Sequence, residues 1–250
     1  MPKAFEKGMT SVTFRNKNVE DVVDISAKAG LSFIEWGADV HVKPGDFAAA
    51  ETAVALMKKS GLYCSAYGSY YRVGDGDIDG FELICKTAAA LGASRVRVWL
   101  GRKGSAETTA AERDALIEET QRLADAAEKY SLDVAFEFHG KTFNDNGKTG
   151  KAFLLDCNRK NVKTYWQPLA FGDSEENLKD IADKVAAVHV FHWNKQNDRF
   201  PLSDGADEWK RYIALLAAAP KPVQMTLEFV AGDSDEQFIA DAKTLDKLIQ

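Results

Sequence analysis

Short runs rich in β-branched and aromatic residues alternate with longer amphipathic segments along the whole sequence. The runs that we expect to form strands are residues 8–14, 31–37, 62–71, 94–101, 132–140, 162–168, 186–193 and 223–230. The segments with helical spacing of apolar residues are 18–30, 46–61, 79–93, 108–130, 148–160, 174–185, 205–219 and 234–250. Because each expected strand is followed by an expected helix, the pattern predicts an α/β fold, a (β/α)8 TIM barrel that occupies residues 1–250 as one domain.

Residues at the ends of these segments support the division. The expected helix N-caps are Asn18, Asp46, Ser174 and Ser234, and such side chains accept hydrogen bonds from the first free amides. Glycine ends the segments KAG, KSG and ALG, where a left-handed residue closes a helix. No GxGxxG pattern follows the first expected strand, which disfavours an open dinucleotide-binding sheet.

The run VAFEFHG places ionisable residues in an otherwise apolar strand. Side chains alternate between the two faces of a strand, so Val134 and Phe136 share one face, while Ala135, Glu137 and His139 share the other. In a TIM barrel the C-terminal ends of the strands carry the chemistry. We therefore expect Glu137 to point inward at the active end of the barrel.

The same alternation selects one polar residue at the end of each of the last four expected strands. These residues are Glu137, Gln167, His189 and Glu228. Two carboxylates, an imidazole and an amide oxygen suit a divalent cation such as Mn²⁺, Mg²⁺, Co²⁺ or Zn²⁺. Without a cation, the two carboxylates would repel each other. The pattern predicts a metal site, for which we favour Mn²⁺.

Further residues are candidates for the surroundings of this site. Arg97 and Trp99 face inward on their strand, Glu35 lies near the end of the second strand, and His41 follows that strand in a loop. A buried ion pair is the competing interpretation, since Arg97 is available to either Glu35 or Glu137.

Composition narrows the classes of partner. The chain has a formal net charge of −6 and a pI near 5.4, which disfavours binding to nucleic acid or anionic membranes. It lacks an apolar run long enough to span a membrane and its N-terminus has no signal-peptide core, so we expect a cytoplasmic protein. Its three cysteines are widely spaced, as is typical of free thiols in a reducing compartment.

Four stretches together resemble a known family. The stretches AKAGLSFIEWGADVH, FEFHG, VHVFHW followed by DR, and TLEFV are similar to the xylose isomerase-like barrel superfamily, in its sugar phosphate isomerase/epimerase branch of ketose 3-epimerases and hydroxypyruvate isomerase-like proteins. The resemblance covers nearly the whole chain. It implies a divalent metal held by residues after strands five to eight, which here are Glu137, Gln167, His189 and Glu228.

The chain departs from the family pattern at two positions. Gln167 stands where the family usually has an aspartate, which lowers the charge of the ligand set by one, and Ala170 stands where a second histidine is frequent. The family's substrate-binding arginine after strand seven has its counterpart in Arg199. His192 is the alternative to His189 as metal ligand, and His139 and His192 are further substrate-binding candidates.

The predicted function is a metal-dependent isomerase or epimerase that acts on a free sugar or sugar acid. The reaction would pass through an enediolate, with Glu137 and Glu228 as acid and base. Two alternatives stay open: a lyase or dehydratase that uses the same site, and a sugar-binding barrel without catalysis. Barrels of this superfamily often associate, so the resemblance also implies a homodimer or homotetramer.

Overall fold

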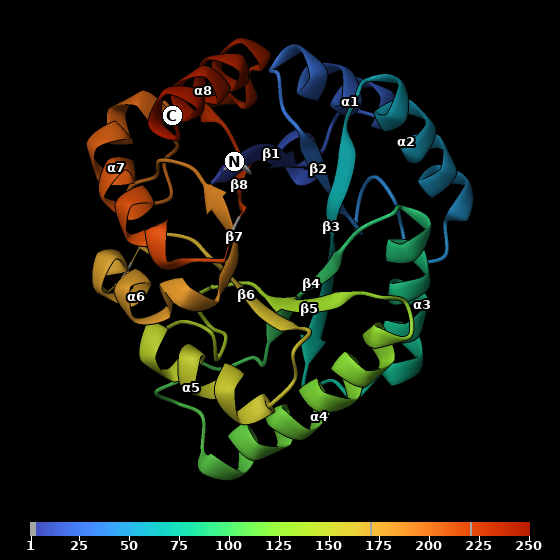
Figure 1. The fold of residues 1–250 in the computed structure, drawn as a ribbon, viewed down its shortest axis with the longest axis vertical. Coiled ribbons are helices and arrows are strands. Elements are labelled where there is room, and N and C mark those ends of the chain that lie inside the picture. The colour runs from blue at the N-terminus through green and yellow to red at the C-terminus, as the bar shows by residue number, and fades with distance from the viewer. Residues whose placement is uncertain (1–3, 171, 221) are drawn as a thin grey trace.

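The computed structural model describes residues 4–170, 172–220 and 222–250, and these form a closed barrel of parallel strands surrounded by helices. The strands follow one another in chain order from β1 to β8, and β1 pairs with β8 to close the barrel. Figure 1 shows the helices arranged around the outside of the strands in the same order. The predicted (β/α)8 TIM barrel is thus confirmed.

The elements agree closely with the expected segments. The strands are β1 (Phe5–Thr10), β2 (Phe33–Gly37), β3 (Tyr63–Val73), β4 (Arg95–Leu100), β5 (Asp133–Phe136), β6 (Val162–Trp166), β7 (Val185–Val190) and β8 (Val223–Leu227). The helices are α1 (Val19–Lys28), α2 (Phe47–Lys59), α3 (Ile78–Ala90), α4 (Ala110–Glu128), α5 (Gly147–Cys157), α6 (Ser174–Ile181), α7 (Ala206–Leu215) and α8 (Asp235–Leu248).

The first strand differs most from its expected position. It begins at Phe5, before the predicted start, and residues Ser11–Phe14 form a 3₁₀ helix instead of its end. The apolar residues of this turn are buried, and the Phe14 ring packs edge-on against Phe238 of α8 with centroids 5.2 Å apart. Only the first part of the run 8–14 therefore pairs in the sheet, and the rest forms this buried turn.

One predicted cap is wrong. Asp173, and not Ser174, is the N-cap of α6, because its side chain accepts the amide of Glu176. The Ser174 hydroxyl accepts the amide of Leu169 instead, at 3.1 Å. The other predicted caps, Asn18, Asp46 and Ser234, each accept an amide of the following turn.

Apolar side chains form the layer between the strands and the helices. On β5, Val134 and Phe136 are fully buried, and the Phe136 ring packs against Phe153 of α5 with centroids 5.7 Å apart. Burial of one such side chain stabilises the fold by roughly 1.5–3 kcal/mol. The outward face predicted for this strand is confirmed.

The inside of the barrel is packed by a separate small cluster. It consists of three alanines, Ala66, Ala135 and Ala187, around the ring of Tyr165. The small residues leave space for the tyrosine ring, whose hydroxyl donates to the Glu35 carboxylate at 2.7 Å. This layer fixes the floor beneath the polar residues at the C-terminal ends of the strands.

Two further sequence-based expectations concern the whole chain. All three cysteines are free and buried, as predicted. Within the described ranges, no helix combines the length and the apolar character that a membrane span requires.

The absence of a side chain at Gly68 of β3 leaves space for the buried side chains of Arg97 and Glu35. Replacing Gly68 tests whether this space is required. A Cβ atom there would lie 2.6 Å from Arg97 Nη2 and 3.2 Å from Glu35 Oε1. We expect Gly68→Ala to lower the free energy of unfolding by about 1–3 kcal/mol, because overpacking forces buried groups apart. Urea unfolding measures this, with the exposed Thr52→Ala as a control for a surface change. An unchanged urea midpoint would show that the Arg97 and Glu35 side chains can move to accommodate the added methyl group.

Candidate metal centre

The four predicted ligands lie at the C-terminal ends of four neighbouring strands. Glu137 and Glu228 follow β5 and β8 directly, Gln167 follows β6, and His189 is near the end of β7. Glu137, His189 and Glu228 are buried, and one donor atom from each lies within 4.8 Å of the others. The alternation of side chains along the strands therefore identified residues that the fold brings together.

The Nδ1 atom of His189 lies at the centre of this group. It is 2.8 Å from Gln167 Oε1, 3.3 Å from Glu228 Oε2 and 3.8 Å from Glu137 Oε1. All four side chains thus turn a donor atom toward the same small volume. We call these four residues the ligand cluster.

Backbone hydrogen bonds hold the two glutamates beyond the ends of their strands. The amide of Glu137 donates to Val98 O at 3.0 Å, and the amide of Glu228 donates to Val190 O at 3.1 Å. Each bond continues the strand pairing by one residue, so both side chains keep the inward direction of the strand. Phe229, the next residue, has a φ of 49°, which turns the chain away from the barrel at once.

Arg97 of β4 connects the ligand cluster to the centre of the barrel. Its Nε donates to Glu35 Oε1 at 2.7 Å, and its Nη1 donates to Glu137 Oε2. Trp99 Nε1 donates to that same oxygen of Glu137. The ion pair that competed with a functional interpretation is therefore present, and Arg97 makes it with both carboxylates. Only Oε1 of Glu137 is left to face the ligand cluster.

The two glutamates of the ligand cluster differ in acidity. Burial opposes the charge on Glu137, but Arg97 and His189 outweigh it and hold the pKa of this carboxyl below its usual value. Burial raises the pKa of Glu228, and the nearby Glu137 charge adds to this effect. Burial alone would lower the pKa of His189, yet the surrounding carboxylates raise it.

The charges of this buried region fit a divalent cation. Three carboxylates, those of Glu35, Glu137 and Glu228, surround one guanidinium, that of Arg97, and one imidazole, that of His189, so the acidic groups outnumber the basic ones. A buried charge without a partner costs several kcal/mol, and a bound cation would supply the missing partner. Two carboxylates, one imidazole and one amide oxygen are also donors that Mn²⁺, Mg²⁺, Co²⁺ and Zn²⁺ accept. The residues present therefore fit a divalent metal.

The predicted substrate-binding residues fall into three groups. His139 lies at the wall of a cavity, where its ring stacks on Trp99 with centroids 4.9 Å apart, and His192 lines the same cavity. Glu35 and Arg97 lie beneath the ligand cluster, 0% and 2% exposed, and do not line that cavity.

Two other predicted residues lie away from the ligand cluster. His41 Nε2 contacts Lys17 O at 3.1 Å, beside the ring of Trp36. The Arg199 guanidinium pairs with Asp233 at 2.6 Å and packs over the ring of Phe229. Neither residue lines the cavity.

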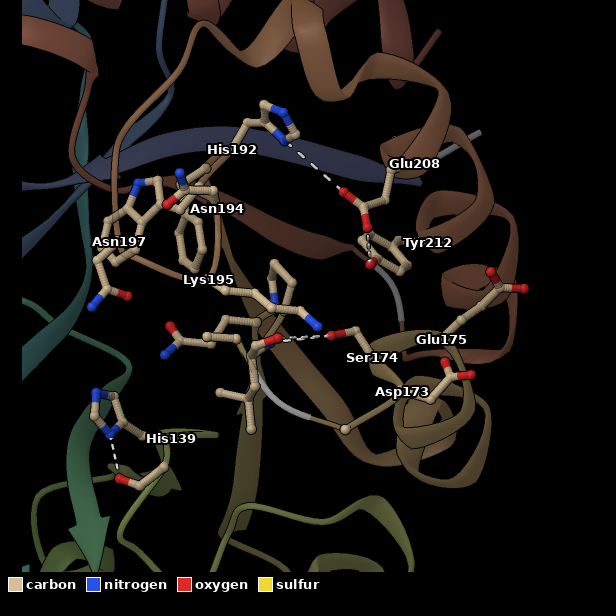
Figure 2. A pocket seen from close by; sticks show the side chains of 18 of the residues that line it. His139, Asp173, Ser174, Glu175, His192, Asn194, Lys195, Asn197, Glu208 and Tyr212 are labelled. Atoms are coloured by element: carbon tan, nitrogen blue, oxygen red, sulfur yellow. Dashed lines mark hydrogen bonds and ion pairs between the residues drawn. The ribbon is translucent and has the colours of Figure 1, made fainter.

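The cavity has a volume of about 770 Å³ and opens between the β6–α6 and β7–α7 loops. It reaches the ligand cluster at Gln167 and extends outward to α7. Figure 2 shows Lys195 reaching into this space, with His192, Glu208 and Tyr212 on one side and Ser174 on another. This volume is in the range of ligand pockets of proteins.

Sequence analysis missed several residues of this region. Lys195, Glu208 and Tyr212 come from a loop and a helix, where the alternation of a strand gives no information. Tyr165 was missed although the signal was there, because it shares the inward face of β6 with Gln167.

The family can be decided by comparison with known proteins. Residues 23–248 match the family described as xylose isomerase-like TIM barrel. The chain belongs to this family. A search of curated proteins finds no match.

Solved structures of similar fold include proteins described as a dehydratase, an epimerase and a zinc-binding protein. A probable 3-DHS dehydratase, AsbF from Bacillus anthracis, is 15% identical with a TM-score of 0.82, over 97% of this chain and 99% of that one. A D-allulose 3-epimerase from Methylomonas sp. is 16% identical with a TM-score of 0.74, over 100% and 99%. The IolI protein, with a bound zinc atom, is 17% identical with a TM-score of 0.77, over 98% of each chain. At these identities the likeness establishes the fold alone.

Metal binding can be tested on the two histidines that competed as ligand. We expect Mn²⁺ at 100 times its Kd to stabilise the wild-type protein by about 2.7 kcal/mol, because the ion binds only the folded state. His189→Ala should abolish this gain. His192→Ala should keep it, because His192 Nδ1 faces Glu208 at 3.9 Å, outside the ligand cluster. Thermal unfolding with and without Mn²⁺ gives the comparison, and an equal gain in both variants would exclude His189 as a ligand.

Proposed function

We propose that this protein is a divalent-metal-dependent enzyme that moves a proton at a carbon next to a carbonyl group of a sugar or sugar acid. The product would be an isomer or epimer of the substrate, formed through an enediolate. The observation that carries the proposal is the buried ligand cluster at the mouth of the barrel, beside a cavity that a small molecule can enter.

Glu137, Gln167, His189 and Glu228 would hold the cation. When bound, the cation would supply positive charge that stabilises the negative oxygen developing on the substrate. Mn²⁺ is our first choice; a related fold that carries zinc supports a divalent metal but does not select one.

Glu228 is the better supported of the two proposed proton carriers. Its Oε2 lies 3.3 Å from His189 Nδ1, and no arginine or tryptophan among the described residues donates a hydrogen bond to its carboxylate, so it can take or give a proton. Glu137 instead gives its Oε2 to Arg97 and Trp99. Its remaining oxygen, Oε1, faces the ligand cluster, so Glu137 is better suited to hold the cation than to exchange a proton.

His139 is a second candidate carrier, on geometric grounds. Its Nδ1 lies 2.7 Å from Gly140 O, and a carbonyl only accepts, so Nδ1 carries the proton of the neutral ring. Nε2 is then the nitrogen free to take or give a proton. Stacking on Trp99 fixes the ring plane at the wall of the cavity.

A second proton carrier supports the lyase alternative, because an elimination needs one group to remove a proton and another to protonate the leaving hydroxyl. In an elimination, the ionised Glu228 would take a proton from the carbon next to the carbonyl. His139, doubly protonated, would give its Nε2 proton to the hydroxyl that leaves as water from the neighbouring carbon. The fold of a probable dehydratase matches this chain over nearly its full length, which supports the barrel as a scaffold for such a reaction but does not favour it over isomerisation.

The substrate would lie between the ligand cluster and the outer part of the cavity. Two sugar epimerases are among the proteins of similar fold, which supports a carbohydrate. Lys195 lines the cavity and makes no hydrogen bond or ion pair with the residues described, whereas Arg199 is occupied by Asp233. We therefore propose Lys195, in place of Arg199, as the cation that meets an acidic substrate group. The cytoplasmic location and the homodimer or homotetramer stay predictions.

Proton exchange with solvent tests the function. Free ketoses and sugar acids would be incubated with the Mn²⁺-loaded protein in D₂O, and NMR would report deuterium at the carbon next to the carbonyl. With a responsive substrate, we expect Glu228→Gln to lower the exchange rate by about 10²–10⁴-fold at saturating Mn²⁺, because the proton carrier is lost. Glu137→Gln is the matched variant, and it should weaken Mn²⁺ binding more than it slows exchange. Full exchange by Glu228→Gln with metal bound would contradict the assignment.

The proposed role of His139 as a proton carrier can be tested in the same assay. His139→Ala should leave Mn²⁺ affinity unchanged, because His139 is outside the ligand cluster, and should slow turnover by about 10²-fold if the imidazole moves a proton. The same NMR spectra distinguish loss of a hydroxyl from exchange, and so separate a lyase from an isomerase. A His139→Ala protein with the wild-type rate would restrict His139 to packing.

A further inference from the structure

The two ring nitrogens of His189 have different surroundings. Nδ1 faces the ligand cluster and is hydrogen-bonded to Gln167 Oε1 at 2.8 Å. Since an amide oxygen only accepts, Nδ1 carries a proton as long as no cation is bound. Nε2 lies on the opposite edge of the ring, is buried, and has no hydrogen-bond partner among the described residues. The acidic atom near it is Glu35 Oε1, 3.7 Å away. Since His189 is 0% exposed, the structure leaves a polar nitrogen unsatisfied next to a carboxylate.

Two hydrogen bonds hold the Glu35 carboxylate in place beside this nitrogen. Its Oε1 accepts from Arg97 Nε at 2.7 Å, and its Oε2 accepts from the hydroxyl of Tyr165 at 2.7 Å. These bonds leave further lone pairs on the carboxylate, which has about four acceptor positions. Because Glu35 does not line the cavity, its carboxylate faces other protein groups and not the space proposed for the substrate.

We propose that Glu35 is the positioning residue of the metal centre. When a cation replaces the Nδ1 proton of His189, Glu35 accepts a hydrogen bond from Nε2, so that the ring keeps its proton there and presents the lone pair of Nδ1 to the cation. This inference rests on the metal site of the proposed function. A neutral imidazole carries one proton, and only the form with that proton on Nε2 leaves Nδ1 free as a ligand. Histidines that bind metals generally donate their other nitrogen to a carboxylate or carbonyl.

The hydrogen bonds around Glu35 extend this arrangement to a second ligand. Arg97 joins Glu35 to Glu137 Oε2, so a guanidinium and a carboxylate from β4 and β2 orient ligands from β5 and β7. Those two strands contribute none of the four proposed ligands themselves. The competing interpretation is that Glu35 is present only to neutralise Arg97, in which case its loss would change stability without changing the affinity for metal.

Cobalt binding separates the two interpretations. Co²⁺ would be titrated into apo-protein by calorimetry, with visible absorption bands recorded as a measure of the ligand geometry. For Glu35→Ala we expect Co²⁺ affinity to fall 10–100-fold, as is typical when the outer partner of a metal ligand is removed, and the bands to shift. Glu35→Gln, which keeps the size and an acceptor oxygen but not the charge, should lose less affinity.

A matched control removes another polar contact inside the barrel. Gln224 accepts from Arg95 Nη1 at 2.7 Å, far from the ligand cluster along β8. Gln224→Met should therefore lower stability without changing Co²⁺ affinity. Wild-type affinity and unchanged bands in both Glu35 variants would overturn the proposal. If the wild-type protein itself binds no Co²⁺, the proposed function fails, which is a distinct result.

A second measurement does not depend on the folding of the variants. The chain has four histidines, so ¹⁵N NMR of the Zn²⁺-loaded wild-type protein can assign the protonation of each ring. We expect His189 to carry its proton on Nε2 and to show a metal-bound Nδ1. A proton on Nδ1, or a metal-bound Nε2, would overturn the proposal.

Discussion

The guanidinium of Arg97 lies between two carboxylates in the centre of the barrel, and the rest of the polar interior is arranged around it. It donates to Glu35 on one side and to Glu137 on the other. Removing one member of such a buried group leaves a charge unpaired, which costs about 3–5 kcal/mol. Gly68 provides the space for it, and Trp99 and Tyr165 complete the hydrogen bonds of the two carboxylates. This arrangement makes the positions of Glu35 and Glu137 depend on each other.

The same arrangement distributes the charges unevenly over the proposed metal centre. Glu137 has a cationic partner, whereas the described residues near Glu228 offer only His189. One carboxylate is thereby suited to remain ionised and immobile, and the other to change its protonation state. The two residues look equivalent in the sequence, since both follow a strand, but they differ in the number of donors around them.

The fold and the ligand cluster followed from simple rules, while the substrate region did not. A strand has a strict period of two, so the inward direction of Glu137, His189 and Glu228 could be inferred before their neighbours were known. The partners of Arg97 could only be given as alternatives, because several carboxylates share the inner face. The positions of Arg199 and Lys195 depend on a loop, whose path is set by long-range contacts such as the Arg199–Asp233 pair. Resemblance to the family selected Arg199 as the substrate-binding cation, whereas the geometry favours Lys195 of the same loop.

Most of the outer wall of the cavity beside the ligand cluster lies outside the strands of the barrel. Its outer lining comes from the β6–α6 and β7–α7 loops and from α7, whereas the ligands and their supporting residues come from the strand ends and the barrel interior. The exposed residues of those loops take no part in the strand pairing or in the buried ion pairs of Arg97. The shape of the cavity can therefore change while the geometry of the ligand cluster stays fixed.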